Sequence, residues 1–401
     1  MLPFVVFLVR KQQQNGAIML NFNDDNQKVF ENKKVLILGH TGFKGYWLSM
    51  VLYKLGAELH GVSLPPLPNK PHPCLDIFKP INDGGIFESN QYANITDVFL
   101  FESVLDRVKP DFIFHLAAQP LVLASYEDPY DTFTTNIVGT LNLLEHLRLF
   151  NKRNPNHRIV VINVTTDKCY RNDEKSIGYV ETDPLGGNDP YSASKAAVEI
   201  MASSYAKSFF KDKAISIINV RAGNVIGGGD FANDRIIPDC VRAIQANENI
   251  HLRNPRAIRP WQHVLDVVDG YLKVAHTAWL QDLNGEAFNF GPSREMINHW
   301  SVIAIVQFFV DYFKTHTKET FKVDVTYDVQ ASSSLKETNI LLLSSEKAKT
   351  KLGWANTLSV SLALGMTADW YRHYLFKKSD DRDMFDFTMK QIELFFDINS
   401  L

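Results

Sequence analysis

The sequence predicts an α/β fold in which a doubly wound parallel sheet is followed by a smaller, mostly α-helical C-terminal domain. Apolar segments of strand length alternate with helical segments through residue 222, which is typical of a parallel sheet covered by helices on both faces. A glycine-rich turn follows the first apolar segment directly, as in open sheets that bind a ligand at their carboxyl edge. Beyond residue 222 the alternation loosens.

The expected strands are mostly short apolar runs, the pattern of strands buried on both faces of a sheet. They are residues 34–38, 58–63, 112–116, 158–164 and 215–220, with a late strand at 287–290. The expected helices are residues 46–55, 130–150, 192–210, 263–278 and 301–313, with a helix inside 230–246.

The turn after the first strand contains Gly39, Gly42 and Gly45 at three-residue spacing. Backbone N–H groups and the helix dipole at such a turn form a site for a pyrophosphate. Gly39 would permit the tight turn, Gly42 would let phosphates approach, and Gly45 would let helix and strand pack closely. The pattern predicts a Rossmann-type dinucleotide site, and a plain glycine-rich loop is the alternative.

The end of the second strand would lie near the adenosine ribose of a dinucleotide. An acidic residue there favours NAD, and an arginine favours NADP. The residues at this position are Ser63 and Leu64, so the second strand does not decide between the two cofactors.

Tyr191 and Lys195 lie four residues apart at the start of the predicted helix 192–210, so they share one helix face. A neighbouring ammonium favours the ionised form of a tyrosine, whose ordinary pKa is near 10. Asp189 and Pro190 precede the pair as a helix start. We therefore predict a tyrosinate base, and the alternative is a solvated helix face.

A third group of polar residues follows strand 158–164, where Thr165, Thr166, Asp167 and Lys168 stand in a row. Ligands of open α/β sheets bind beyond such strand ends. A hydroxyl, a carboxylate and an ammonium at this place indicate a catalytic site, although a polar loop would give the same spacing.

These motifs resemble a known superfamily. The spacing Gly-x-x-Gly-x-x-Gly resembles the extended short-chain dehydrogenases/reductases, and Thr166-Asp167-Lys168 lies where the sugar-nucleotide 4,6-dehydratases keep Thr-Asp-Glu or Thr-Asp-Lys. The lysine form resembles the branch that acts on CDP-glucose. The segments that extend the resemblance are 39–45, 115–122, 167–170, 221–230 and 259–264. It covers residues from about 33 to 371 of the chain.

The resemblance implies NAD as cofactor. Asn94 and Ile95 stand where the superfamily holds the adenine. The residues implied in cofactor binding are Gly39, Thr41, Gly42, Phe43, Gly45, Asn94, Ile95, Leu116, Ala117, Ala118, Asn136, Tyr191 and Lys195.

The resemblance also implies catalytic roles. Tyr191, helped by Lys195, would take the proton of the sugar 4-hydroxyl, and Thr166 would orient that oxygen. Asp167 is the candidate acid and Lys168 the candidate base for loss of water. The residues implied in substrate binding, with CDP-glucose as the expected substrate, are Gln119, Ser125, Asn224, Arg235, Arg259 and His263, with Tyr126 beside Ser125.

Two alternatives stay open. The first is another enzyme of the same fold, either an epimerase or a dehydratase for GDP-mannose or dTDP-glucose. The second is a dinucleotide-binding protein without turnover. The Gly227-Gly228-Gly229 run is read either as a segment that closes on a ligand or as a flexible loop.

The resemblance implies two domains. The cofactor domain would comprise residues 29–222 and 262–290, and the substrate domain residues 223–261 and 291–401. Residues 1–28 would be a disordered extension, or translation would begin at Met19. Helices near 130–150 and 192–210 are those the superfamily uses for dimers, so a homodimer is expected, although a monomer core would explain their apolar spacing equally well.

Composition limits the function classes. The 401 residues carry a net charge of −3, with 45% hydrophobic and 22% charged residues, which gives no indication of a nucleic-acid partner. The apolar run 2–9 is too short to span a membrane. The chain has three scattered cysteines, Cys74, Cys169 and Cys240, which form no Cys-x-x-Cys pair. We therefore expect no metal site and a location in the reducing cytoplasm.

Overall fold

The computed structural model describes residues 28–66, 71–72, 74–173, 175, 177–252, 254–317, 322–327, 341–377 and 380–399. Its main feature is a seven-stranded sheet in the order β10-β6-β5-β4-β1-β2-β3. All neighbouring strands of this sheet are parallel. The predictions about an N-terminal extension and about Met19 concern residues that lie outside the described part of the chain.

The predicted strands are confirmed to within two residues at each end. The sheet consists of β1 Lys34–Leu38, β2 Glu58–Ser63, β3 Ser89–Tyr92, β4 Phe112–His115, β5 Ile159–Val164, β6 Ile215–Ala222 and β10 Ala287–Phe290. The sequence analysis did not predict β3. This strand is polar and partly exposed because it forms the sheet edge and pairs with β2 alone, so it lacks the apolar run of a central strand.

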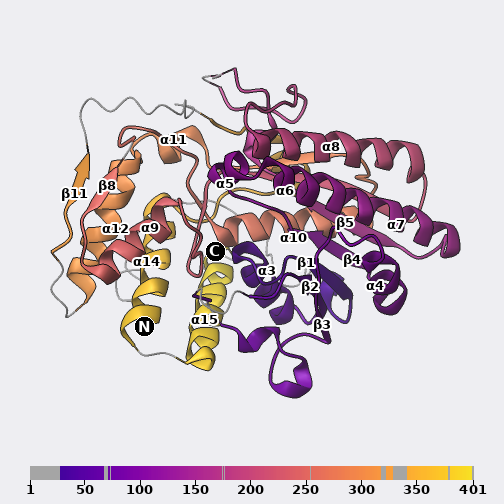
Figure 1. Cartoon of the computed structure of the whole chain (residues 1–401), viewed down its shortest axis with the longest axis horizontal. Helices are drawn as coiled ribbons and strands as arrows, with labels where there is room; N and C mark the ends of the chain where they lie inside the picture. Colours follow the sequence, from indigo (N-terminus) through magenta and orange to yellow (C-terminus); the bar gives the residue numbers. More distant parts are fainter. Residues whose placement is uncertain are drawn as a thin grey trace.

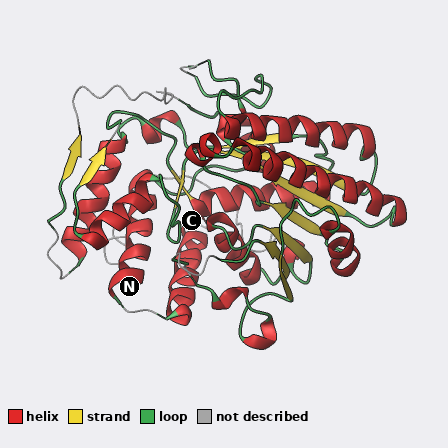
Figure 2. Cartoon of the chain, viewed as in Figure 1, coloured by secondary structure: helices red, strands yellow, loops and turns green. Residues whose placement is uncertain are grey.

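Helices cover both faces of the sheet (Figures 1 and 2). The side chains of Val35 and Ile37 join one apolar cluster, whereas those of Leu36 and Leu38 join another, as the two-residue period of a strand requires. The first cluster packs under helices α3 Phe43–Lys54 and α10 Val264–Leu280, and the second under α4 Leu100–Val108, α7 Gly139–Arg153 and α8 Pro190–Phe209. The doubly wound sheet is therefore confirmed.

Three short helical segments precede α7. They are α5 Val122–Glu127, α6 Pro129–Phe133 and a π-helical turn at Thr134–Val138. The remaining 3-10 turns are Asp76–Phe78, Ile81–Asp83 and Asp167–Cys169.

The C-terminal part is mostly helical, as expected. Its elements are β7 Val225–Ile226, α9 Ile236–Ala246, β8 Ile250–Leu252, β9 Gln262–His263, α11 Arg294–Ile297, α12 Val302–His316, β11 Val325–Tyr327, α13 Glu346–Leu352, α14 Val360–Phe376 and α15 Asp381–Asn399. One apolar cluster continues from Val35 in the sheet to Trp370 in α14. The division into two domains remains a prediction.

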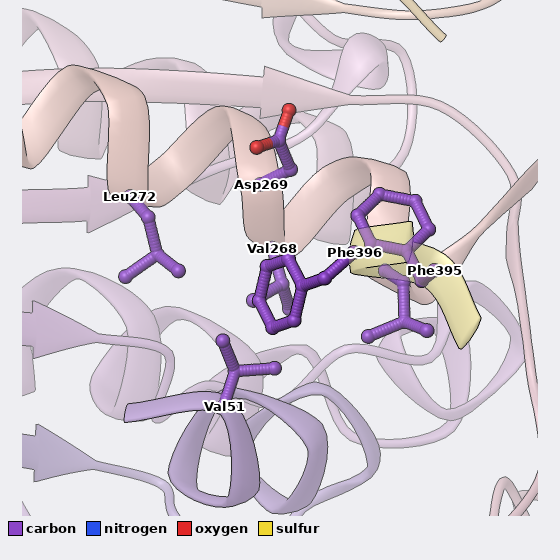
Figure 3. Close-up of a pocket in the computed structure, with 7 residues that line it drawn as sticks. Val51, Val268, Asp269, Leu272, Phe395 and Phe396 are labelled. Atoms are coloured by element: carbon purple, nitrogen blue, oxygen red, sulfur yellow. The ribbon is translucent and has the colours of Figure 1, made fainter. Parts of the chain in front are cut away.

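The last helix, α15, covers helix α3 of the sheet. The Tyr46 hydroxyl on α3 and the Trp370 indole N–H both contact Thr388 Oγ1 at 2.9 Å. Phe395 and Phe396 are buried against α3 and α10 around a small cavity (Figure 3). These two phenylalanines therefore cover apolar surface of α3 and α10.

Two features typical of other classes of protein are absent from the described residues. None of the helices there combines the length and hydropathy needed to span a bilayer. No group of three or more histidine, cysteine, aspartate or glutamate side chains that could hold a metal ion occurs in that part of the chain.

Candidate active site

The predicted site residues follow strands whose carboxyl ends lie at one edge of the sheet. Strands β1, β4, β5 and β6 are neighbours and run in the same direction. The glycine turn follows β1, residues 116–118 follow β4, residues 165–168 follow β5, and Gly223 and Asn224 follow β6. In open α/β sheets this edge is where ligands bind.

Two of the three turn glycines, Gly39 and Gly45, have the backbone geometry expected of them, and the role of Gly42 toward phosphates remains a prediction. Gly39 has a φ of +88°, and a Cβ there would lie 2.7 Å from Ala117 N. A Cβ on Gly45 would lie 2.2 Å from the carbonyl oxygen of Gly39, so helix α3 could not approach the turn. Gly42 is different, because its Cβ would meet only Gly39 O, at 3.4 Å.

The N-terminus of α3 has the features of an anion site. Gly42 is its N-cap, no side chain caps it, and its first turn holds no acidic residue. The first amides of a helix lack partners within the helix, and the dipole there is positive. A pyrophosphate therefore fits this helix start, and a Cβ at Gly39 or Gly45 would clash with the backbone that shapes it.

The glycine turn is joined to the end of β2. The hydroxyl of Thr41 lies 2.5 Å from that of Ser63 and 3.3 Å from the carbonyl oxygen of Leu64. The side chain of His72 hydrogen-bonds the Thr41 carbonyl oxygen at 3.0 Å. Ser63 is buried by this arrangement.

The remaining predicted cofactor residues lie on neighbouring loops. Asn94 is exposed, and its side chain accepts a hydrogen bond from Thr96 N at 3.1 Å. Ile95 is buried on Gly139, where a Cβ would come within 2.5 Å of Ile95 Cδ1. Leu116, Ala117 and Ala118 are half-buried behind β4, and Phe43 is half-buried in the first turn of α3.

Asn136 and Gln119 form a structural link, although a ligand contact was predicted for each. Asn136 is 1% exposed, and its amide binds Gln119 O at 3.1 Å and Ser194 Oγ at 2.8 Å. The side-chain nitrogen of Gln119 donates to Leu121 O and, at 2.8 Å, to Thr132 Oγ1, and its side-chain oxygen accepts from Leu121 N. These contacts hold the loop after β4 against α8 and leave the Gln119 amide committed to protein partners.

Tyr191 and Lys195 lie in the first turns of α8, as predicted. Asp189 caps this helix by accepting from Ser192 N at 2.9 Å. Burial raises the pKa of Tyr191 to about 12, and a hydrogen bond with the Thr166 side chain only partly opposes the shift. This is opposite to the lowering expected from Lys195. In the protein alone, removal from water dominates the pKa of Tyr191, and the cation that partly opposes it is Arg235.

Lys195 is bound to the strand beside it. Its ammonium donates to the carbonyl oxygen of Val164 at 3.2 Å. Burial lowers the pKa of Lys195 to about 8, while the Glu199 carboxylate one helical turn away opposes the shift.

Thr166, Asp167 and Lys168 lie on the 3-10 turn after β5. The Thr166 hydroxyl donates to Asp167 Oδ1 at 3.0 Å, and Lys168 Nζ lies 3.6 Å from the same oxygen. Asp167 is 1% exposed, and its Oδ2 has no hydrogen-bond partner among the described residues. A buried carboxylate oxygen without a partner is costly, so this atom is suited to meet a ligand.

Three further charged residues share the site. Arg235 pairs with Asp230 at 2.8 Å, and the Tyr371 hydroxyl donates to the Asp230 carbonyl oxygen. Burial, together with the cations Arg235 and Lys195, lowers the pKa of Lys44 to about 7. The sequence analysis assigned no role to Lys44, Asp230 or Tyr371. Lys44 and Asp230 carried a signal, since both lie inside segments on which the family resemblance rests.

The run Gly227-Gly228-Gly229 is neither a closing segment nor a flexible loop. All three glycines are buried, and a Cβ on Gly228 would lie 2.0 Å from Trp370 Cγ. The Trp47 indole N–H binds the Gly228 carbonyl oxygen at 2.8 Å. The glycines let the chain pass between two tryptophans.

Two residues predicted to bind substrate, His263 and Ser125, are buried and have protein partners in this structure. His263 is fully buried beside Trp47, and its Nδ1 accepts from Leu265 N at 3.2 Å as the N-cap of α10. Ser125 is also fully buried and donates to Val122 O at 2.6 Å. Neither side chain presents surface to a ligand.

The remaining predicted contacts keep some accessible surface. Asn224 is half-buried between β6 and β7, and Arg259 is half-buried, with Nη1 3.2 Å from Ile258 O. Tyr126 is 53% exposed.

Comparison with known proteins places the chain in a family. The family profile described as GDP-mannose 4,6-dehydratase matches residues 36–367. A CDP-glucose 4,6-dehydratase of Salmonella typhimurium is 36% identical over 358 residues, which are 87% of this chain and 93% of that protein. A dTDP-glucose 4,6-dehydratase of Xanthomonas campestris is 26% identical over 284 residues, 70% of this chain and 77% of that protein.

Solved structures share the fold. A dTDP-glucose 4,6-dehydratase from Bacillus anthracis in complex with NAD aligns with a TM-score of 0.62 and 21% identity, over 84% of this chain and 96% of that one. A UDP-glucose 4-epimerase from Thermotoga maritima aligns with a TM-score of 0.67 and 21% identity, over 85% and 99% of the two chains. The chain therefore belongs to the GDP-mannose 4,6-dehydratase family, as the motifs indicated.

Proposed function

We propose that this protein is an NAD-dependent sugar-nucleotide 4,6-dehydratase that converts CDP-glucose to CDP-4-keto-6-deoxyglucose. One observation carries the proposal. A buried carboxylate with an unpartnered oxygen, Asp167, stands between Thr166 and Lys168 on the turn beside Tyr191. This arrangement supports acid–base chemistry in addition to oxidation.

The residues at the sheet edge fit NAD. Gly39, Gly42 and the uncapped start of α3 would hold its pyrophosphate. Asn94 and Ile95 would lie at the adenine, and Lys195 at the nicotinamide ribose. When bound, NAD supplies a reversible oxidant that accepts hydrogen from C4 of the sugar and later returns it to C6.

Tyr191 and Thr166 would act on the sugar 4-hydroxyl. The Tyr191 oxygen takes the hydroxyl proton, while Thr166 holds the same oxygen in place by a hydrogen bond. Because burial raises the pKa of Tyr191 to about 12, the tyrosinate needs a nearby positive charge. Lys195 supplies one such charge, and oxidised nicotinamide would add a second.

Lys168 and Asp167 would remove water from the resulting 4-ketone. The ketone makes the C5 proton acidic, and the Lys168 amine accepts this proton. The bond between C6 and its oxygen breaks as Asp167 gives a proton to the departing hydroxyl, which leaves as water. Lys168 would return its proton to C5 as hydrogen returns to C6, and the proton that Tyr191 took from the 4-hydroxyl would restore Asp167 through solvent. The 3.6 Å separation of Lys168 Nζ and Asp167 Oδ1 would place base and acid side by side for this step.

The choice of CDP-glucose has two supports. The relative from Salmonella typhimurium is 36% identical across 87% of this chain. Lys168 occupies the place where the sequence analysis expects glutamate in dehydratases for dTDP-glucose or GDP-mannose. Arg235 and Arg259 are the proposed partners of the substrate diphosphate, with Asn224 beside them.

Mass spectrometry of reaction products tests the proposal. Purified protein is incubated with NAD and, separately, with CDP-glucose, dTDP-glucose, UDP-glucose or GDP-mannose, with Tyr191→Phe as control. We expect loss of one water from CDP-glucose alone and no net reduction of NAD. Loss from another nucleotide sugar would contradict the substrate. Isomer formation without loss of water would indicate an epimerase, and NAD binding without conversion a non-catalytic protein.

We also propose that the protein is a homodimer. Large apolar side chains are exposed on α6 and α8, namely Tyr130 at 80%, Ile200 at 60% and Phe209 at 44%. Helices α6 and α8 lie against each other (Figure 1), and exposed apolar groups on adjacent elements mark interaction surfaces. Light scattering should give twice the chain mass. Ile200→Glu should halve it, whereas the control Ile177→Glu, at a site 74% exposed, should not.

A cytoplasmic location is proposed with these functions. Cys74, Cys169 and Cys240 are free and buried, which suits a reducing compartment. Fractionation of cells that produce the protein would test the location.

A further inference from the structure

A buried ion pair lies behind the turn that carries Asp167 and Lys168. The guanidinium of Arg221 on β6 forks onto the carboxylate of Glu199 on α8, with Nε 2.9 Å from both oxygens. Both side chains are almost completely buried, at 4% and 1% exposure. Removing two charges from water is expensive unless the pair is well oriented and further hydrogen bonds satisfy it.

The ion pair contacts two segments of the proposed active site, the turn after β5 and helix α8. Glu199 accepts a hydrogen bond from Thr165 Oγ1 at 2.5 Å, and Thr165 directly precedes Thr166. Glu199 also lies one helical turn after Lys195 on the same face of α8. The carboxylate thus touches the start of the 3-10 turn and the helix that carries the tyrosine.

Arg221 holds the other end of the turn through Tyr170. The guanidinium Nη1 donates to the Tyr170 hydroxyl at 2.5 Å, and the Arg221 side chain lies 4.7 Å from the Tyr170 ring centre. The same hydroxyl donates to Asn289 Oδ1 on β10 at 2.8 Å. Tyr170 is the C-cap of the turn Asp167–Cys169, so its position sets where that turn ends.

We propose that Arg221, Glu199 and the Tyr170 hydroxyl act as positioning residues that hold the turn bearing Asp167 and Lys168 against helix α8. The inference rests on the proposed dehydratase function. The network is anchored in α8, β5, β6 and β10, and it clamps the turn from Thr165 to Tyr170. Oxidation at C4 depends on Tyr191 and Lys195, with Thr166 at the end of the turn that Glu199 holds through Thr165. Loss of water depends on Asp167 and Lys168, which lie between Thr166 and Tyr170, so loosening the turn at Tyr170 would impair that step first.

Tyr170→Phe is the variant of choice because it removes one hydroxyl and leaves the buried ion pair intact. Truncating Arg221 would leave Glu199 buried and unpaired, which is expected to prevent folding. A matched control is Tyr179→Phe. Tyr179 is also 1% exposed, stacks on Tyr170 at 5.0 Å, and its hydroxyl binds Asn172 and Asp173 instead of the network.

Both variants are mixed with NAD and CDP-glucose, and reduced cofactor and dehydrated product are followed in the same single turnover. Thermal unfolding is recorded in parallel. For Tyr170→Phe we expect product to form about 10- to 100-fold more slowly with KM unchanged, the size of effect that a misplaced catalytic group produces. Reduced cofactor should accumulate because oxidation continues. Tyr179→Phe should resemble the wild type in both measurements, even if both variants lose similar thermal stability.

Two results would overturn the inference. If Tyr170→Phe and Tyr179→Phe behave alike, or if Tyr170→Phe slows oxidation and loss of water equally, the Tyr170 hydroxyl contributes only to stability. If the wild type itself neither reduces NAD nor dehydrates any nucleotide sugar, the proposed function fails and the inference fails with it. The wild-type measurement distinguishes the two cases.

Discussion

The Lys195 ammonium donates a hydrogen bond to the carbonyl oxygen of Val164, the last residue of β5, with 3.2 Å between Nζ and O. This contact joins helix α8 to the strand whose end leads into Thr166 and Asp167. It also orients a cation that burial makes unusually easy to deprotonate, since the pKa of Lys195 is lowered to about 8.

The first prediction is a pH dependence of turnover. Lys195 is an ammonium below its lowered pKa of about 8 and loses its charge above it, so its help to the tyrosinate disappears as pH rises. Tyr191, with a pKa raised to about 12, gains ionised form with rising pH. We therefore expect kcat/KM to climb at low pH and to fall above about pH 8, measured as initial rates of product formation at low substrate concentration. A rate that keeps climbing past about pH 9 would contradict a role for the Lys195 charge.

The second prediction concerns the base itself. Tyr191→Phe removes the hydroxyl but keeps the ring that packs at the start of α8. Loss of a positioned base typically costs about 10²- to 10⁴-fold in rate, so kcat for dehydration should fall by that factor. NAD affinity, followed by the cofactor's quenching of tryptophan fluorescence, should change little. A variant with nearly wild-type kcat would exclude Tyr191 as the base.

The third prediction separates two glycines of the same turn. Gly42→Ala adds a Cβ with its nearest neighbour at 3.4 Å, so the fold should hold while the methyl group obstructs the approach of phosphates. NAD affinity should fall, as measured by calorimetry. Gly45→Ala adds a Cβ 2.2 Å from Gly39 O, and overpacking of this kind costs about 1–3 kcal/mol.

Urea unfolding of the two alanine variants gives the control. Gly45→Ala should unfold at a lower urea concentration than the wild type, and Gly42→Ala at nearly the same concentration. Equal destabilisation of both would show that the open space at Gly42 does not serve a ligand.

The fourth prediction concerns a buried carboxylate on α10. Asp269 is 2% exposed, lines the cavity formed with Val51, Phe395 and Phe396 (Figure 3), and pairs with Lys273 at 3.4 Å. Burial raises the pKa of Asp269 from 3.8 to about 6, although Lys273 opposes the shift. The folded state therefore binds this proton more tightly than the unfolded state does.

The sign of the stability change follows from that shift. The contribution of Asp269 to the free energy of unfolding is fully present below about pH 4 and is lost as pH rises through about 6, a change of about 3 kcal/mol. Asp269→Asn does not titrate. Its stability relative to the wild type should therefore increase by about that amount between pH 4 and 7, measured by urea unfolding.

A matched control is Asp239→Asn on α9. Asp239 also pairs with a cation one turn away, Arg242, but its side chain is 45% exposed, so its removal should change stability by less than about 1 kcal/mol at either pH. If Asp269→Asn shows no more pH dependence than this control, water reaches Asp269 and the carboxylate is not desolvated.

Much of the fold could be predicted because its signals are local. Apolar runs marked the central strands, since a strand buried on both faces is hydrophobic throughout. Strand β3 had no such run, because it is a polar edge strand. Its backbone pairing with β2 stabilises it, and burial of its side chains does not. The start of α8 was visible because Asp189 is a local cap of its own helix.

Ligand contacts of single side chains could not be predicted as well. Gln119, Ser125 and His263 lie in motifs of the right family, yet the structure commits their polar atoms to protein partners. Which partner a polar group finds depends on the segments folded against it. The packing of the Gly227–Gly229 run also depends on a distant segment, since Trp370 is far away in the sequence and fills the space beside Gly228.

The sequence by itself determined the parallel sheet, the glycine turn and the Tyr191–Lys195 spacing, because strand burial, positive φ and helical period are properties of short segments. Only the tertiary structure decided the charge states and the supports of the site. The raised pKa of Tyr191 and the lowered pKa of Lys195 result from burial under distant segments. The pairing of Glu199 with Arg221 joins a helix to a strand. Desolvation and long-range pairing depend on which segments meet, and that is set only when the chain has folded.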